Sequence, residues 1–384
     1  MRVAITVGPG TGTRYLGWSP VPAQVRVTDA AGAAGPLDVI IRNSGAGAGR
    51  VSFSAGAPWQ PVDELVLTLP LTGQPVAFLV AGEFGRPSTI DGDAVVEAVG
   101  ADDALLGATP LMVRVRKDAT TLTPLERDRF CAALATFNDR GRGRFRDFRN
   151  THTQAGDPEA HGFAGFLPWH RAFLLDLERE LQAIDPSVAL PYWRFDRPAP
   201  SLFSRDFMGV TTAATGAVEF SSTNLLQFWA TDSVPGIVRR PQFNTREAPA
   251  GVRTEITTLR LGGPGATYTA FRALEGNPHG TAHLSFTGSI SSIPTAAKDP
   301  LFFLLHANVD RLWAKWQWLA GRFSPNDART FSPDQTPRVG HRLGDTMWPW
   351  NGITTPPRPP TAPGGTMAPS ALVAAPGACR GSST

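Results

Sequence analysis

Several features that define common protein classes are scarce or missing in this chain. Its 384 residues contain two cysteines, Cys131 in an apolar run and Cys379 near the end, which excludes a disulfide framework. No stretch approaches the about 18 apolar residues of a membrane span, so we expect no membrane partner. The first residues lack the apolar core of a secretory signal, which predicts a cytoplasmic protein and leaves export with a partner open.

The net charge is also small. Lysine and arginine total 36 against 33 acidic residues, which leaves +3 and argues against a nucleic-acid partner. One basic run departs from this balance, and it is typical of a solvated loop or helix face, with RNA or an anionic surface as the alternative. The run comprises Arg140, Arg142, Arg144, Arg146 and Arg149.

Residues 1–118 contain no histidine and no catalytic cluster, and their pattern is that of β-structure. Gly, Pro, Asp and Ser separate eight short apolar or alternating runs: VAITV, AQVRVTD, LDVIIRN, GRVSFSA, ELVLTLP, VAFLVAG, AVVEAVG and LMVRVRK. Regularly spaced short strands predict a β-sandwich. We interpret this region as a structural or interaction module.

Residues 119–322 have helical periodicity and predict a mainly α, bundle-like domain. Thr123, Pro124 and Glu126 have the pattern of a helix start, with a threonine cap and a glutamate at the third position. Further helices are expected over 169–184, 278–284 and 300–319. Residues 323–384 are rich in Pro and Gly, and their apolar stretch 365–375 is either a lid over the functional site or part of an unstructured tail.

Histidine clustering is the strongest signal in the sequence. Of seven histidines, His341 stands apart and the other six form two triplets, namely His152, His161 and His170, then His279, His283 and His306. Neutral imidazole suits copper, zinc, iron and nickel. Residues four apart share a helix face, so His279 and His283 can bind one ion. Two triplets in one helical region predict two adjacent metal ions.

The residues around the triplets narrow the choice of metal. A blue-copper site needs a cysteine ligand, and neither cysteine lies near a triplet. The HExxH pattern of thermolysin-like zinc sites is absent. One three-histidine group alone is also compatible with zinc.

Two segments carry a resemblance to a known family. HGFAGFLPWHRAFLLDLERELQ followed by LPYWRFD is similar to the first copper motif of tyrosinases, catechol oxidases and other type-3 copper proteins. LEGNPHGTAHLSFTG followed by DPLFFLLHANVDRLWAKWQ is similar to the second. The resemblance implies that each triplet holds one of two copper ions and that dioxygen is the co-substrate.

The resemblance also implies roles for neighbouring residues. Glu275 matches a glutamate that holds a water able to act as base towards the phenol. Gly280 replaces an asparagine that goes with hydroxylation of monophenols, so oxidation of o-diphenols is the safer expectation. Leu284 is expected to line the substrate entrance. Ile293 stands where some relatives place a phenylalanine over the first copper ion.

Two further positions complete this comparison. Asp310, four residues after His306, is a candidate for orienting that imidazole, with an ion pair to Arg311 or a solvent-facing charge as the alternatives. Glu159 stands where some relatives have a cysteine that forms a thioether to the second ligand, so no such link is expected.

The resemblance implies a binuclear copper oxidase that converts o-diphenols to o-quinones. Whether it also converts monophenols is left open at this point. An o-aminophenol oxidase and a non-enzymatic, hemocyanin-like oxygen carrier are the alternatives, because both would use the same six histidines. A small phenolic substrate is the expected partner, and a copper-delivery protein is a further candidate.

Overall fold

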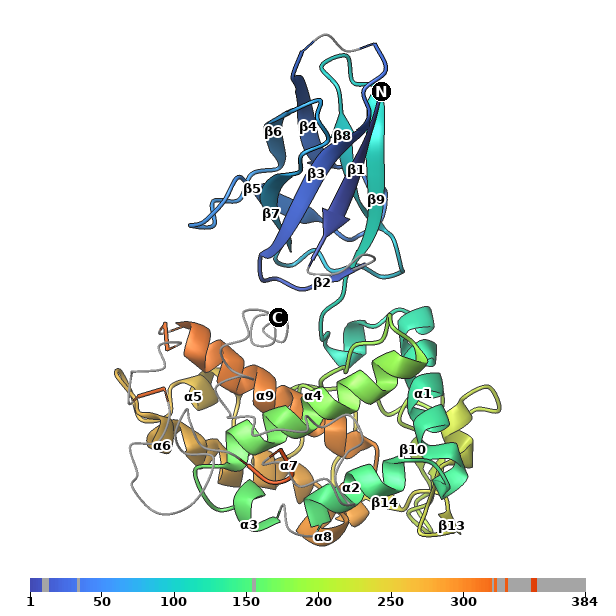
Figure 1. The fold of residues 1–384 in the computed structure, drawn as a ribbon. Helices are drawn as coiled ribbons and strands as arrows, with labels where there is room; N and C mark the ends of the chain where they lie inside the picture. Colours follow the sequence, from blue (N-terminus) through green and yellow to red (C-terminus); the bar gives the residue numbers. More distant parts are fainter. Residues whose placement is uncertain are drawn as a thin grey trace. The chain divides into compact units, whose positions relative to one another are not determined.

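The computed structural model describes residues 1–8, 14–32, 35–153, 157–319, 321–322, 329–330 and 347–350 (Figure 1). The chain divides into two compact units, Met1–Val115 and Arg116–Thr384, which are described separately. Cys379, His341 and the expected lid at 365–375 lie outside the described residues. In the part of the chain that is described, no helix is long and apolar enough to cross a membrane.

The first unit consists of β-strands, as the sequence predicts. Each of the eight runs contributes to a strand, and a short ninth strand, β2, joins them. The strands are β1 (Arg2–Val7), β2 (Tyr15–Leu16), β3 (Val21–Asp29), β4 (Leu37–Asn43), β5 (Val51–Ser54), β6 (Glu64–Leu69), β7 (Val76–Gly82), β8 (Ala94–Val99) and β9 (Leu105–Val113). β9 begins earlier than its apolar run because its register is set by antiparallel pairing with β8.

These strands form two sheets around one core. One sheet has the order β1-β3-β7-β5, and the other has the order β2-β9-β8-β4-β6. Alternate residues of β3 point inward, and Val25 is fully buried between polar neighbours. Val39, Phe53, Val80 and Val96 from both sheets join it in a single apolar cluster. The alternation read from the sequence therefore marks the buried faces.

The second unit is mainly helical, which confirms the predicted order of a β region followed by a helical region. Its helices are α1 (Pro124–Asn138), α2 (Phe145–Thr153), α3 (Asp157–Ala160), α4 (Phe166–Ile184), α5 (Glu255–Leu259), α6 (Tyr268–Phe271), α7 (Thr281–His283), α8 (Ile293–Ala296) and α9 (Leu301–Leu319). Two-stranded pairs complete it, formed by β10 (Val210–Thr211) with β11 (Val218–Glu219), β12 (Ala230–Thr231) with β13 (Val234–Pro235), and β14 (Arg239–Pro241) with β15 (Phe286–Gly288).

The start of α1 agrees with its sequence signal. The Thr123 hydroxyl accepts a hydrogen bond from the Glu126 N–H, and the Glu126 carboxylate accepts one from the Thr123 N–H at 2.9 Å. Pro124 occupies the first helical position, where its missing N–H costs nothing. Cys131, farther along α1, is buried, as expected for a core thiol. Burial raises the pKa of this thiol, which keeps it protonated.

α4 and α9 pack side by side and form the centre of this unit (Figure 1). α4 starts at Phe166, earlier than the expected Trp169, because Pro168 lies in the first turn, where no intrahelical N–H bond is needed. α9 begins after Asp299, whose carboxylate accepts from the Leu301 N–H at 2.9 Å. Phe173 of α4 contacts Phe303 of α9 with ring centroids 5.9 Å apart.

The expected helix over 278–284 is interrupted. Asn277 has extended dihedrals, φ −146° and ψ 120°, as is usual for a residue before proline. A wide turn over Gly276–Gly280 follows, and α7 spans only Thr281–His283. The backbone nevertheless keeps His279 and His283 on one side, which is what the four-residue spacing predicts.

The arginines of the basic run contact several partners within the unit. Arg144 pairs with the buried Glu180, and Arg149 pairs with Asp232. Arg140 lies over the ring of Phe228 at 4.5 Å. Arginines of the basic run therefore contact side chains of their own structural unit.

Candidate metal centre

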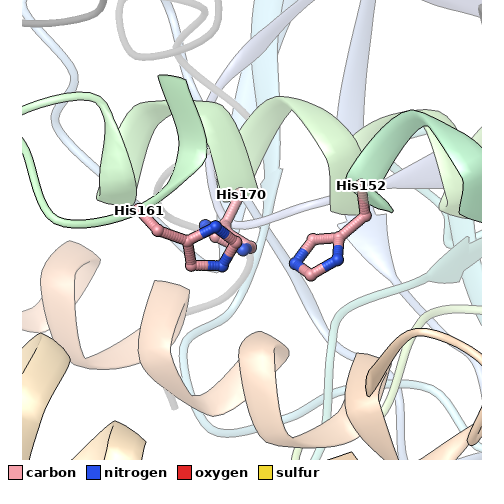
Figure 2. Close-up of side chains that lie close together, drawn as sticks. All are labelled: His152, His161 and His170. Carbon is pink, nitrogen blue, oxygen red and sulfur yellow. The ribbon is translucent and has the colours of Figure 1, made fainter. Parts of the chain in front are cut away.

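The first histidine triplet converges from three segments (Figure 2). His152 lies in α2, His161 follows α3 and His170 lies in the first turns of α4. One nitrogen from each ring lies within 4.8 Å of the others. The ring centroids of His152 and His161 are 4.9 Å apart, and those of His161 and His170 are 5.1 Å apart.

The second triplet converges in the same way from the 276–283 segment and α9. The Nε2 atoms of His279 and His283 each lie 3.2 Å from Nε2 of His306. Three nitrogen atoms at this spacing form a small open ring around a common point. A single metal ion at that point would be bound by three imidazoles and keep positions free for other ligands.

Backbone carbonyls orient three of the rings. The Nδ1–H groups of His170, His279 and His283 donate to the carbonyls of Phe166, Glu275 and Ile290 at 2.8, 2.8 and 2.7 Å. In this tautomer Nε2 carries the lone pair and faces the centre of its triplet.

Burial leaves other ring nitrogens in need of a ligand. Among the described residues, both nitrogens of His152 and Nε2 of His170 are buried without a hydrogen-bond partner. Buried polar atoms in folded proteins almost always have partners, so these atoms fit ligands of a metal ion.

The electrostatic environment keeps the imidazoles neutral. Burial lowers the pKa of His152, His170, His279 and His306 well below the ordinary value, and the neighbouring histidines lower it further. Burial likewise lowers the pKa of His283, to about 4. Neutral imidazole is the form that binds metal, so the sites are ready for it at neutral pH.

The two triplets are adjacent. The rings of His170 and His306 stack with centroids 4.2 Å apart and an interplanar angle of 13°. Phe302 covers both triplets, with its centroid 4.8 Å from that of His152 and 4.2 Å from that of His306. Two metal ions held here would share one apolar chamber.

A cavity of about 280 Å³ opens this chamber to solvent. Among the described residues, its wall includes five of the six histidines, the apolar side chains of Leu284, Ile290, Ile293 and Ala296, and Glu275 as the one carboxylate. Leu284 is 64% exposed and Ile293 is 46% exposed, so they form the rim of the opening. The cavity is small and mostly apolar, with a few polar groups, as is usual for sites that bind small molecules.

Comparison with known proteins decides the family. The family model described as the common central domain of tyrosinase matches residues 142–319. The tyrosinase of Streptomyces glaucescens is 35% identical over 262 residues, which cover 62% of this chain and 92% of that protein. The chain belongs to the tyrosinase family. A second tyrosinase, from Streptomyces antibioticus, is 34% identical over 266 residues, covering 62% of this chain and 94% of that protein.

A solved structure adds a weaker likeness. A functional unit from octopus hemocyanin aligns with 70% of this chain and 65% of its own length, at 20% identity and a TM-score of 0.43. This TM-score is too low for the overlay alone to establish a shared fold.

Tyrosinase-family proteins are type-3 copper proteins, so the cofactor is a pair of copper ions, and the protein is a copper-dependent oxidase. The convergent Nε2 atoms and the unpartnered nitrogens of His152 fit this pair. When bound, the copper pair supplies the site for dioxygen and accepts the electrons removed from a substrate.

The pocket residues expected from the family resemblance lie around this centre. Glu275, Gly280, Leu284 and Ile293 all line the cavity. The Glu275 carboxylate is held from two sides, because it accepts hydrogen bonds from the Gly162 N–H and from Arg272, each at 2.6 Å. A Cβ at position 280 would lie 3.2 Å from the Glu275 carbonyl, so this side of the wall has little spare room.

Asp310, which is buried, takes none of the three roles considered from the sequence. Its two oxygens accept hydrogen bonds from Arg116 and Arg171 instead of from His306. Arg311 donates to Glu255 and not to Asp310. Guanidinium groups bind carboxylate more strongly than a neutral imidazole does, which explains the different partner.

Sequence reasoning missed the docking of the segment 347–350 beside the first triplet. The Trp348 carbonyl accepts from the Trp169 indole at 2.7 Å, and its N–H donates to Glu159 at 2.8 Å. The Trp350 indole donates to the buried Asp176 at 2.7 Å. The two tryptophans within a Pro- and Gly-rich stretch were the available signal, because such residues are unusual in an unstructured tail.

Proposed function

We propose that this protein oxidises o-diphenols to o-quinones with dioxygen. Two diphenol molecules each lose two electrons and two protons, and one dioxygen molecule takes these up to form two molecules of water. The support is the copper pair of the family together with a cavity that leads from solvent to both histidine triplets.

The main support for this proposal is the open rim of the cavity. An oxygen carrier needs only a path for dioxygen, whereas an oxidase must admit an aromatic ring. The cavity of about 280 Å³ has room for such a ring, and the exposed Leu284 and Ile293 leave its entrance accessible. This observation favours an enzyme over a hemocyanin-like carrier.

The protein residues have separate tasks in the proposed reaction. The carbonyl-bound imidazoles hold their Nε2 atoms in place, so little reorganisation is needed. Phe302 keeps water away from the histidines. Glu275 is fixed by Arg272 and the Gly162 N–H, and its place in the cavity wall supports a role in taking the phenol proton through a water molecule.

Gly280 supports diphenols as the main substrates. It has no side chain that could help Glu275 to hold a water for the more demanding hydroxylation of monophenols. The backbone at Gly280 is helical, with φ −58° and ψ −39°, so an asparagine is allowed there with a small adjustment of the wall. We expect Gly280→Asn to raise the ratio of monophenol to catechol turnover, measured as quinone formation. An unchanged ratio would count against this role.

The apolar rim of the cavity also favours substrates whose ring substituents are neutral or apolar. Leu284, Ile290, Ile293 and Ala296 present hydrocarbon, and Arg272, the cation that contacts Glu275 of the wall, is already paired with it. A catechol with a carboxylate would therefore find no free positive partner among the described residues that line the cavity.

The finer description of the fold is part of the same proposal. We place a β-sandwich in residues 1–118, supported by two sheets around one core, and a helical copper bundle in residues 119–322, supported by α4 packing on α9 and α1. Residues 323–384 are then a C-terminal extension.

The deciding experiment is oxygen uptake by copper-loaded protein with 4-methylcatechol, 4-methylphenol and 2-amino-4-methylphenol. Uptake mainly with the catechol supports the proposal. Faster uptake with the aminophenol, also under direct competition, would make the protein an o-aminophenol oxidase. Reversible oxygen binding without uptake on any substrate would show a carrier.

A further inference from the structure

A buried charge network joins the two helices that carry the adjacent histidines. Arg171 of α4 donates to Asp310 of α9, and both side chains are almost fully buried. Arg171 directly follows His170, and Asp310 lies one helical turn after His306. We propose that Arg171 and Asp310 are positioning residues that fix the register of α4 against α9 and thereby the separation of the two copper sites.

Arg171 holds α9 over more than one turn. Besides Asp310, its guanidinium donates to the Gln317 side-chain oxygen at 3.2 Å and lies over the Trp313 ring at 3.8 Å. These partners span two turns of α9, so sliding or rotation of one helix along the other would break several contacts together.

Arg116 provides a second connection between Asp310 and α4. This residue is the first of the helical unit, and it donates to Asp310 at 2.9 Å and to Glu178 of α4 at 2.9 and 3.2 Å. Asp310 therefore receives one guanidinium on each oxygen, and both arginines lead back to α4. The two acids raise the pKa of Arg116 in spite of its burial, so the charges persist within the network.

The geometry of the centre explains why this register matters. His170 belongs to the first triplet and His306 to the second, and their rings stack at 4.2 Å. A shift of α9 moves His306 relative to His170, while His152 and His161 lie on other elements. The register of α4 and α9 thus sets the position of one ligand of the first site relative to one ligand of the second.

The test compares copper-loaded wild type with Asp310→Asn. Two Cu(II) ions that lie close enough to couple give little EPR signal, and the signal per copper grows as they separate. We expect Asp310→Asn to retain two copper ions per chain but show a larger EPR-visible fraction. Catechol kcat is expected to fall by up to about 100-fold, because misplacement of reacting groups by about 1 Å has that effect.

A matched control separates position from stability. Asp299 forms another fully buried pair, with Arg239 at 3.0 Å, but this pair does not join α4 to α9. Asparagine at this position keeps a side-chain oxygen for the Leu301 N–H, so the start of α9 is preserved. Asp299→Asn should lower the midpoint of thermal unfolding and leave the EPR-visible fraction unchanged. An equal rise in that fraction in Asp299→Asn would overturn the proposal, since general loosening would then explain the effect.

A milder variant covers the case in which Asp310→Asn does not fold. Gln317→Met keeps the volume and removes one partner of Arg171. We expect a smaller rise in EPR-visible copper in the same direction, with the KM for catechol little changed. A wild-type EPR fraction in every folded variant with two copper ions would also overturn the proposal.

Discussion

The two halves of the copper centre are supported in different ways. In the second triplet, His279 and His283 donate to carbonyls of nearby residues, four and seven positions away. In the first, His152 has no hydrogen-bond partner among the described residues, and the surrounding residues depend on the distant segment 347–350. Two rings of the second half are thus held by nearby carbonyls, against one ring, His170, in the first half, whose surroundings also depend on long-range packing.

The difference has a consequence for metal binding. Carbonyl contacts orient His279 and His283 of the second site, which then needs only His306 from α9. The first site needs three separate elements and the 347–350 segment in place. We infer that disturbances of packing affect the first copper ion before the second.

Removal of one ligand from each half gives the largest expected effect. His152→Ala and His283→Ala should each reduce copper from two ions per chain to one and abolish catechol oxidation, because the reaction needs both ions. Copper analysis after gel filtration and oxygen uptake measure this. Retention of two tightly bound ions by either variant would contradict the ligand assignment.

Low pH should destabilise the metal-free protein, because histidines of both triplets are buried in the folded state. Folding lowers the histidine pKa values, whereas the unfolded chain takes up protons below about 6.5. The metal-free protein should therefore lose stability as the pH falls from about 6.5 towards 4, by up to about 1.4 kcal/mol per pH unit for each such histidine. Urea unfolding at pH 7 and pH 5 measures it, and equal midpoints would refute the expectation.

The support of the first half is tested by Trp169→Phe. The change leaves the buried Trp348 carbonyl without its donor, which should cost about 1–3 kcal/mol of unfolding free energy. Titration with a chelator should then remove the first copper ion sooner and the second as in wild type. Trp193→Phe is the matched control, because its indole N–H is buried without a hydrogen-bond partner among the described residues. Equal behaviour of the two variants would show that the 347–350 segment does not support the site.

The smallest expected effect is a change in KM. It tests which of the two triplets lies nearer to the ring substituent of a bound substrate. Leu284→Arg lies next to His283 of the second triplet, and Ile293→Arg lies at the start of α8, which contacts α2, the helix that carries His152 of the first triplet. An exposed ion pair should lower the KM for 3,4-dihydroxyphenylacetate by about two- to fivefold relative to 4-methylcatechol. The variant with the larger change identifies the side, and Leu284→Gln is the uncharged control. No change in either arginine variant would place the substituent elsewhere.

Elements defined by short-range patterns were predictable. The Thr123 cap, the run of α9 and the alternation in β3 depend on interactions within a few residues, which the sequence displays directly. The start of α4 was misplaced because Pro168 is allowed in a first turn as well as before one. In the segment 276–283 the expected helix is interrupted, because Asn277, the residue before Pro278, adopts extended backbone dihedrals.

The site was predictable to the extent that its chemistry depends on residue type and spacing. The two triplets converge as the sequence suggested, whereas the partners of Asp310 could not be inferred. Arg116 lies 194 positions from Asp310, and no local pattern connects them.

The sequence by itself determined which side chains can hold metal, because six of the seven histidines are grouped in two triplets. The local backbone of the structure then orients His170 and His279, since each donates to a carbonyl four residues earlier. Tertiary structure decided the rest. The stacking of His170 on His306, the network around Asp310 and the docking of Trp348 on Trp169 join residues more than 100 positions apart. Such contacts form only when the chain has packed, because their energy depends on a shared buried environment rather than on neighbours in sequence.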